Sequence, residues 1–249
     1  MMKLRQVADV RLPTRWADFR LLAFEGRWDE ALGKQGRSET MLALVLGDIH
    51  GSPPVVRIHS QCLTGEVFHS LRCDCHDQFH MAMARIAEEG SGILLYEHQE
   101  GRGIGLLEKL RAYELQDRGF DTIEANLHLG HPVDLRNYKL AVGVLRVLNV
   151  RSLRLMSNNP EKIEAVLSSG IEIVERLSAD VPGGPHSAYY VATKRERLGH
   201  LSKPPTVPHE ATCTGKPISR GALSREPGTD GCKAKTAGLQ IADLRYAEG

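Results

Sequence analysis

Three cysteines are crowded into one short part of the sequence: Cys62 lies in HSQCLTG, and Cys73 and Cys75 lie in LRCDCHDQ. Thiolates bind Zn²⁺ strongly, and a structural zinc site closes with four protein ligands whereas a catalytic site keeps one position open for water. Free cysteines are often small buried hydrophobic residues, but the charged neighbours of Cys73 and Cys75 argue against that interpretation. The cluster therefore predicts a metal site with three thiolate ligands.

A fourth protein ligand would decide between a structural and a catalytic zinc. Three nearby histidines are candidates for it, namely His69, His76 and His80. The spacing matches no zinc-finger signature, and the other two cysteines, Cys213 and Cys232, lie far along the chain. The residues alone leave both kinds of site open.

Composition limits the cellular setting and the partners. The chain has 249 residues, with 32 Lys and Arg against 31 Asp and Glu, so no net charge points to a nucleic acid or a membrane as partner. The N-terminal region lacks an apolar run of signal-peptide length, and no segment approaches the ~20 apolar residues of a spanning helix. We therefore expect a cytoplasmic protein. Thiols stay reduced in the cytosol, and five cysteines is an odd number, which disfavours a disulfide framework.

Hydrophobic periodicity predicts a chain in which strands and helices alternate. Short apolar runs bounded by Gly or Pro predict strands at residues 41–49, 54–58, 92–96, 152–157 and 171–177. Apolar residues at helical spacing predict helices at residues 77–89, 106–119, 138–150 and 160–169. The first two strands are separated only by the turn HGSPP, so we expect them to pair. The alternation predicts an α/β fold of the mixed α+β kind, with a mixed sheet and flanking helices.

The composition changes after Lys203. Pro, Gly, Ser, Thr and charged residues dominate there, and apolar periodicity disappears. Such a segment cannot bury enough apolar surface to offset its ordering entropy. We therefore expect one folded domain at residues 1–203 and a disordered tail at residues 204–249.

Longer motifs around the cysteines resemble a known enzyme family. The segment RIHSQCLTGEVFHSLRCDCHDQ resembles the zinc-binding signature of GTP cyclohydrolase II, which runs R-x-H-S-x-C-x-T-G-D and then S-x-R-C-D-C-G-x-Q. Four further segments resemble that family's motifs in the same order, namely QEGRGIGLLEKLRAYELQDRGFDTIEAN, LGHPVDLRNY, SNNPEKI and TKRERLGHL. The resemblance covers about residues 30–202. It implies a single-domain GTP cyclohydrolase II-like fold, and it implies an enzyme that opens the imidazole ring of GTP, releases formate and pyrophosphate, and begins riboflavin synthesis.

The resemblance also implies roles for the residues that could do chemistry. Cys62, Cys73 and Cys75 would hold a catalytic zinc, Arg136 would attack the α-phosphate, and Asp134 would accept the proton that Arg136 loses. Tyr113 would act near the zinc during ring opening, and Mg²⁺ would accompany the phosphates of GTP. Without the resemblance, Asp134 and Arg136 would fit an exposed ion pair equally well, and Tyr113 would be an aromatic on the apolar face of a helix.

The same resemblance implies a set of residues that contact GTP. They are Arg57, His59, Ser60, Gln61, Gln78, Glu100, Gly101, Arg102, Thr122, Ser157 and Lys162. In QEGRGIG the glycines permit close approach of the backbone to a phosphate, and Arg102 can clamp one with its planar fork. A Gly-rich loop by itself is more often only a turn. The family also suggests a homodimer.

Four positions depart from the family pattern. Gln61 replaces Glu, Glu66 replaces Asp, His76 replaces Gly, and Ser157 replaces Thr. The loss of a charge at Gln61 puts its role in base recognition in doubt, and His76 would change the loop conformation or add a polar group near the metal. None of the four changes touches the cysteines, Tyr113, Asp134 or Arg136.

Two alternatives remain open at this point. A variant cyclohydrolase that retains the formamide product would share every motif. A zinc-stabilised module that binds nucleotides or RNA without catalysis would require a fourth protein ligand and a basic surface, and the balanced charge argues against the second requirement.

Overall fold

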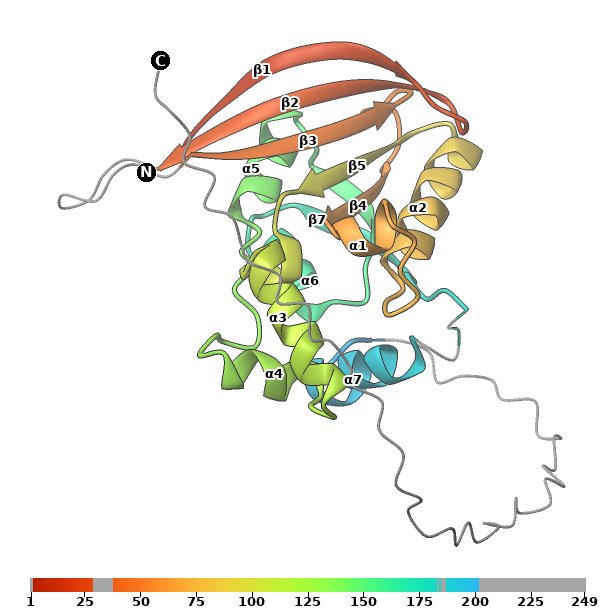
Figure 1. Ribbon diagram of the computed structural model, residues 1–249. Helices are drawn as coiled ribbons and strands as arrows, with labels where there is room; N and C mark the ends of the chain where they lie inside the picture. The colour runs from red at the N-terminus through yellow and green to blue at the C-terminus, as the bar shows by residue number, and fades with distance from the viewer. Residues whose placement is uncertain (1, 29–37, 183, 185–186, 202–249) are drawn as a thin grey trace, which may run out of the picture. The chain divides into compact units, whose positions relative to one another are not determined.

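A seven-stranded sheet flanked by helices makes up the described part of the chain (Figure 1). The computed structural model describes residues 2–28, 38–182, 184 and 187–201. The strands are β1 (Met2–Pro13), β2 (Asp18–Trp28), β3 (Ser38–Leu46), β4 (Val55–Ser60), β5 (Gly92–Glu97), β6 (Ser152–Met156) and β7 (Glu172–Leu177). The helices are α1 (Leu63–Glu66), α2 (Cys75–Glu89), the 3₁₀ helix η1 (Glu100–Gly103), α3 (Leu106–Asp117), α4 (Thr122–His128), α5 (Lys139–Val147), α6 (Pro160–Leu167) and α7 (Ala188–Leu198).

The sheet is mixed, as predicted. Its strand order is β1-β2-β3-β5-β4-β6-β7. Pairing is antiparallel from β1 to β5 and parallel from β5 through β4 and β6 to β7. The predicted α/β class, with a mixed sheet and flanking helices, is therefore confirmed.

The predicted pairing of residues 41–49 with residues 54–58 is wrong. Strand β5 lies between them, so that Met41 of β3 faces Glu97 and Val55 of β4 faces Gly92. Every residue of β4 before Ser60 is buried, which is typical of a central strand of a parallel sheet. After β4 the chain returns through α2 to a parallel neighbour, and the turn HGSPP connects two strands that are not adjacent.

The described elements that sequence periodicity did not predict are β1, β2, α1, η1, α4 and α7. Strand β1 is mostly exposed and carries charged side chains among its apolar ones, so it lacks the buried run that identifies a strand. The predicted tail at residues 204–249, with Cys213 and Cys232, lies outside the described residues. No helix in the described ranges is both long and apolar enough to cross a membrane.

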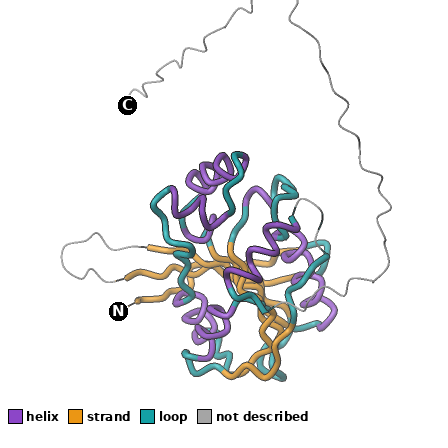
Figure 2. The backbone as a smooth tube through the Cα atoms, turned by 90° about the horizontal axis from the view of Figure 1, so that it is seen from below, coloured by secondary structure: helices purple, strands orange, loops and turns teal. Residues whose placement is uncertain are grey.

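Helices cover both faces of the sheet (Figure 2). Helices α5 and α6 pack on one face through Leu145 and Val166, whereas α2 packs on the other through Met83 and Ile86. Side chains alternate along a strand. In β4, therefore, Val56 and Ile58 face α5 and α6, and the alternate positions, which include Arg57 and His59, face α2.

The topology places a site at the carboxyl end of β4. From β4 the chain first builds β5 on one side and later builds β6 on the other side of β4. The strand order therefore reverses at β4, and ligands of open α/β sheets bind where strand order reverses, beyond the carboxyl ends of the strands. The cysteine motif begins two residues after β4 ends.

Replacement of Gly47 by Ala should destabilise the fold strongly. Gly47 follows β3 with φ +63°, and an added Cβ would come within 2.0 Å of the carbonyl oxygen of Gly90 at the end of α2. We expect Gly47→Ala to lower the free energy of unfolding by about 2–5 kcal/mol, from backbone strain and overpacking together.

Gly170→Ala is the matched control, since Gly170 also has positive φ but nothing lies within 4 Å of its added Cβ. Gly170→Ala should lower the free energy of unfolding only by the cost of backbone strain, about 1–2 kcal/mol. Equal urea midpoints for the two variants would show that the close approach of Gly47 to Gly90 is unimportant.

Candidate active site

Two adjoining cavities lie at the carboxyl end of β4. The larger, of about 350 Å³, is lined by these predicted site residues: Ser60, Gln61, Cys62, Cys73, Cys75, Glu100, Gly101, Arg102, Tyr113, Thr122 and Arg136. The smaller, of about 70 Å³, is lined by Arg57, His59, Ser60, Cys75, Gln78, Arg102, Arg136, Ser157 and Lys162. Asp134 lines neither cavity but is hydrogen-bonded to Arg136, which lines both. The structure thus brings all the predicted site residues together.

The three thiols form a compact donor set. The sulfur atoms of Cys62, Cys73 and Cys75 all lie within 4.8 Å of one another, and those of Cys62 and Cys73 are 3.6 Å apart. Zn–S bonds of about 2.3 Å place sulfur atoms about 3.8 Å apart in a tetrahedral site, so these residues fit a zinc ion. Among the described residues no other His, Cys, Asp or Glu completes this group, so His69, His76 and His80 are not part of it.

Electrostatics around the thiols favours one thiolate. Hydrogen bonds from Cys73 and Cys75, with help from the Lys109 ammonium, lower the pKa of Cys62, whereas the hydrogen bond to Cys62 raises the pKa of Cys73 to about 11. The Lys109 Nζ donates to the Cys62 sulfur at 3.1 Å and to Glu100 Oε1 at 2.6 Å. Sequence reasoning missed Lys109, although it lies one helical turn before Tyr113 on the same face of α3.

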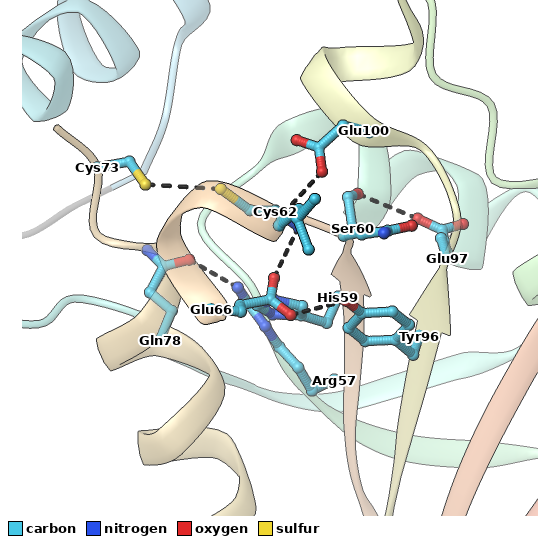
Figure 3. Close-up of polar contacts among 12 residues, drawn as sticks. Arg57, His59, Ser60, Cys62, Glu66, Cys73, Gln78, Tyr96, Glu97 and Glu100 are labelled. Carbon is cyan, nitrogen blue, oxygen red and sulfur yellow. Dashed lines mark hydrogen bonds and ion pairs between the residues drawn. The ribbon is translucent and has the colours of Figure 1, made fainter. Parts of the chain in front are cut away.

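Glu66 anchors the first ligand (Figure 3). Its Oε1 accepts from the backbone N–H of Cys62 at 2.8 Å and lies 2.9 Å from His59 Nε2, while its Oε2 accepts from the Tyr96 hydroxyl at 2.8 Å. Burial lowers the pKa of His59, so this ring is neutral and donates to the carboxylate. The longer side chain that replaces Asp therefore has partners at both oxygens.

Glu100 and Tyr113 meet the cysteine loop from the opposite side. Glu100 Oε2 accepts from the backbone N–H of Leu63 at 2.7 Å, which fixes the start of α1. The Tyr113 hydroxyl lies 3.4 Å from Thr64 Oγ1, which in turn lies 3.7 Å from the Cys62 sulfur. Burial raises the pKa of Tyr113 to about 12, so its phenol keeps its proton at neutral pH and can donate a hydrogen bond within the cavity.

Asp134 and Arg136 form a pair that is largely withdrawn from solvent. Arg136 Nε donates to Asp134 Oδ1 at 2.9 Å and Nη2 donates to Oδ2 at 2.5 Å, and both side chains are almost buried. Burial opposes the charge on Arg136, but the hydrogen bonds to Asp134, together with electrostatic interactions with Tyr138, Asp134 and Tyr190, outweigh it and raise the pKa of the guanidinium. The third nitrogen, Nη1, lies 3.5 Å from the Ser60 hydroxyl. An exposed surface pair is therefore excluded.

The smaller cavity is rich in positive charge. Lys162 Nζ donates to the carbonyl of Ile58 at 2.8 Å, and Arg57 donates to Gln78 Oε1 at 2.7 Å and to the carbonyl of Met156 at 3.1 Å. Burial, then the charges of Arg136 and Arg57, lowers the pKa of Lys162. Neither Nη1 nor Nη2 of Arg102 has a hydrogen-bond partner among the described residues, although both atoms are buried. Buried donors of this kind are costly when unpaired, so the cavity suits an anion.

The remaining predicted residues make few side-chain contacts with the thiols or the basic groups. Gln61 Oε1 lies 2.9 Å from His98 Nδ1, Thr122 is the first residue of α4, and Ser157 Oγ accepts from the N–H of Asn159 at 3.1 Å. His76 lies in the first turn of α2 with no positive φ. The position therefore does not require glycine in this chain.

Sequence reasoning also missed three residues that enclose the site. Glu97 is buried at the end of β5, where its Oε2 accepts from Ser60 at 3.2 Å, and burial raises its pKa to about 7. Tyr190 of α7 lines both cavities, and Lys194 of the same helix lines the smaller one. The carboxyl of Glu97 could have been suspected because it ends an apolar strand in the motif YEHQEG, but the partners of Tyr190 and Lys194 lie too far away in the sequence to be inferred.

The fold and the site define an α/β protein that gathers three cysteine thiols and a cavity lined by basic side chains at the ends of parallel strands. The family model for GTP cyclohydrolase II matches residues 5–178. The chain belongs to the GTP cyclohydrolase II family. This confirms the predicted family and an enzyme of the hydrolase class.

Curated relatives agree with this assignment. GTP cyclohydrolase-2 of Klebsiella pneumoniae is 48% identical over 206 residues, which cover 82% of this chain and 99% of the relative. GTP cyclohydrolase-2 of Escherichia coli is 48% identical over 201 residues, which cover 80% and 98%. A solved two-domain 3,4-dihydroxy-2-butanone 4-phosphate synthase from A. baumannii covers 72% of this chain and 40% of its own, with a TM-score of 0.38 and 16% identity, a similarity too weak to bear on fold or function.

Replacement of Gly65 by Ala should weaken metal binding without unfolding the protein. An added Cβ would lie 2.9 Å from the Cys73 sulfur and 3.2 Å from the Cys62 sulfur, so the thiols would have to move apart. We expect zinc affinity at least about tenfold below wild type, the scale of disturbed metal surroundings. Gly184→Ala is the control because its added Cβ meets nothing within 4 Å. If zinc titration gave the same affinity for both variants, the close approach of Gly65 to the Cys62 and Cys73 sulfur atoms would not matter for zinc binding.

Glu97 should make stability fall as pH rises. Its pKa is raised from 4.5 to about 7 in the folded protein, so between these values the folded state binds more protons than the unfolded state and stability decreases with pH. Glu97→Gln cannot ionise and should lack this decrease. In urea unfolding, the free energy of unfolding of the variant relative to that of wild type should be higher at about pH 8 than at about pH 5. Parallel changes in both proteins would place the Glu97 pKa near its ordinary value.

Proposed function

We propose that this enzyme hydrolyses GTP at its purine ring, releases formate and pyrophosphate, and supplies the diaminopyrimidine that begins riboflavin synthesis. The observation that carries the proposal is the shared cavity in which the three thiols, Tyr113 and Arg136 meet beside a basic pocket. A ring to be opened and a phosphate to be attacked can then be parts of one bound molecule.

In this proposal the phosphates of GTP bind in the smaller cavity. Arg102 has unpaired guanidinium nitrogens, the Arg57 guanidinium adds positive charge, and the Lys162 amine adds a hydrogen-bond donor at the same place. Planar guanidinium groups bind phosphate oxygens through paired hydrogen bonds. Mg²⁺ bound to the phosphates would neutralise part of the remaining charge.

Arg136 is the proposed nucleophile toward the α-phosphate. Guanidinium is normally fully protonated, and the pairing with Asp134 strengthens that tendency. Attack on phosphorus therefore requires that a proton leave at the same time, and Asp134 lies within hydrogen-bond reach to receive it. The Nε and Nη2 atoms are held by Asp134, which orients the guanidinium plane.

The larger cavity is the proposed place of ring opening. Cys62, Cys73 and Cys75 would hold a zinc ion, and when bound it would supply Lewis-acid activation of water for attack on the purine. Tyr113 would donate a hydrogen bond from its protonated phenol to a developing negative charge. Gln61 and Glu100 line the same cavity and would position the base.

The two alternatives receive different support. A zinc-stabilised binding module would require a fourth protein ligand, and the described residues place none beside the three thiols. An enzyme that retains the formamide would share the same cavity, and only the products distinguish it. Formate and pyrophosphate measured from GTP, with zinc content on the same sample, test the proposal. Absence of formate with pyrophosphate present would favour the formamide-retaining enzyme.

Three further proposals accompany the function. The enzyme would be a homodimer, as the family suggests, and it would act in the cytoplasm. Residues 1–203 would form the catalytic domain, and residues 204–249 would be a dispensable tail. Sedimentation of the full chain tests the homodimer. Turnover by a chain ending at Lys203 tests whether the tail is dispensable.

Substitution of the Asp134–Arg136 pair should separate a nucleophile from a phosphate clamp. Arg136→Lys keeps the charge but loses the planar fork, so a nucleophilic role predicts a fall in turnover of at least about 10²-fold. Asp134→Asn should be nearly as damaging, and both variants should retain zinc. The assay measures formate and pyrophosphate at saturating GTP and Mg²⁺.

Arg151→Lys, an exposed position after α5, is the control and should retain turnover. Near wild-type release of both products by Arg136→Lys would show that Arg136 only attracts phosphate.

A further inference from the structure

Helix α7 reaches the site from the C-terminal part of the described chain. It spans Ala188–Leu198, beyond the end of the family-model match at residue 178, and lies near the start of α4 (Figure 1). Its attachments are polar: Lys194 forms an ion pair with Asp74, Arg197 forms one with Asp121, and Leu201 beyond the helix donates from its N–H to the carbonyl of Asn158. The first of these, the Lys194–Asp74 ion pair, contacts the turn Cys73–Asp74–Cys75, which is called the metal-ligand turn below.

Asp74 lies between two of the three thiol ligands. It is buried, and each of its carboxylate oxygens has one partner: Oδ1 accepts from Lys194 Nζ at 2.6 Å and Oδ2 accepts from Gln78 Nε2 at 2.8 Å. Gln78 in turn accepts from Arg57. A continuous chain of hydrogen bonds therefore runs from α7 through the Cys73–Asp74–Cys75 turn to the basic cavity.

The buried ammonium of Lys194 in turn depends on Asp74 for its opposite charge. Its side chain is only 13% exposed, and its ammonium lies 4.5 Å from the centre of the Tyr190 ring. A buried ion pair that loses one partner leaves an uncompensated charge, which is strongly destabilising. Loss of either partner would therefore leave a buried, uncompensated charge beside the turn.

We propose that Lys194 is a positioning residue for the metal site, which holds the turn carrying Cys73 and Cys75 through its ion pair with Asp74. The backbone of Asp74 is continuous with both ligands, so an anchored Asp74 side chain restricts where the two sulfur atoms can lie. Groups that orient metal ligands typically account for about 10–100-fold in metal affinity. This inference rests on the proposed thiolate site.

Lys194 also lines the smaller cavity, and this location provides the competing role of a direct phosphate ligand. The two roles predict different losses. A phosphate ligand affects the KM for GTP and leaves metal binding intact. A positioning residue affects metal retention even when no GTP is present.

The test measures zinc loss from the full-length, zinc-loaded protein on addition of a chelator, without substrate. Lys194→Met should lose zinc about 10–100-fold faster than wild type, and Lys194→Arg should restore part of the retention because it keeps the charge and can donate to Asp74. Amide hydrogen exchange in residues 72–78 should also accelerate in Lys194→Met. In Asp74→Asn, the further change Lys194→Met should add little, because the two residues act as one unit.

Arg197→Met is the matched control, since it breaks another ion pair of the same helix that contacts Asp121 and not the metal-ligand turn. It should retain zinc like wild type. Equal zinc loss in Arg197→Met and Lys194→Met would show that general undocking of α7 is responsible and would overturn the specific role. Wild-type retention in Lys194→Met with a raised KM would assign phosphate binding instead.

Cys73→Ser separates failure of this inference from failure of the site. If wild type binds no zinc, or if Cys73→Ser retains it fully, the proposed thiolate site is wrong. If wild type and Lys194→Met retain zinc equally while Cys73→Ser loses it, the site stands and only the role of Lys194 is wrong.

Discussion

Positive charge buried at the carboxyl end of β4 is the constraint on which the site depends. Removal of an ion from water costs several kcal/mol unless partners compensate for it. Arg136 is compensated by Asp134 and Lys194 by Asp74, while Arg57 is hydrogen-bonded to Gln78 and to a carbonyl. Arg102 lies over the Tyr190 ring, but its Nη1 and Nη2 atoms have no hydrogen-bond partner among the described residues. The protein alone thus leaves buried guanidinium donors unpaired, which phosphate oxygens could accept from.

The sheet topology makes this concentration of charge possible. Parallel strands β5, β4, β6 and β7 end at one edge, and the segments that follow β4, β5 and β6 converge there. Alternation along β4 directs Arg57 and His59 to the face covered by α2, whose first turn carries Cys75 and Gln78. The proposed metal ligand Cys75 and the basic group Arg57 are therefore positioned by the same strand and helix, so a displacement of α2 would disturb both.

Sequence patterns identified the elements with strong apolar periodicity and failed where polar contacts position the chain. Helices α2 and α5 have buried apolar faces and were predicted, whereas α7 is attached by Lys194 and Arg197 to acids 120 and 76 residues away. The pairing of β3 with β4 was wrong because a short connecting turn does not reveal an inserted strand. The motifs identified the thiols and the Asp134–Arg136 pair. Lys109 and Glu97 were missed because their importance arises only from tertiary contacts.

Three of the four departures from the family pattern, Gln61, Glu66 and His76, lie next to the cysteines in sequence or contact the cysteine segment, whereas Ser157 lines the smaller cavity. Two carboxylates, Glu66 and Glu100, already support the Cys62 turn through the backbone N–H groups of Cys62 and Leu63. The neutral Gln61 has its Oε1 atom 2.9 Å from His98 Nδ1. A further carboxylate at Gln61 would add negative charge next to Cys62, whose pKa is already lowered in favour of the thiolate. The neutral amide avoids that repulsion, and since it both donates and accepts hydrogen bonds, it can still contact a purine base.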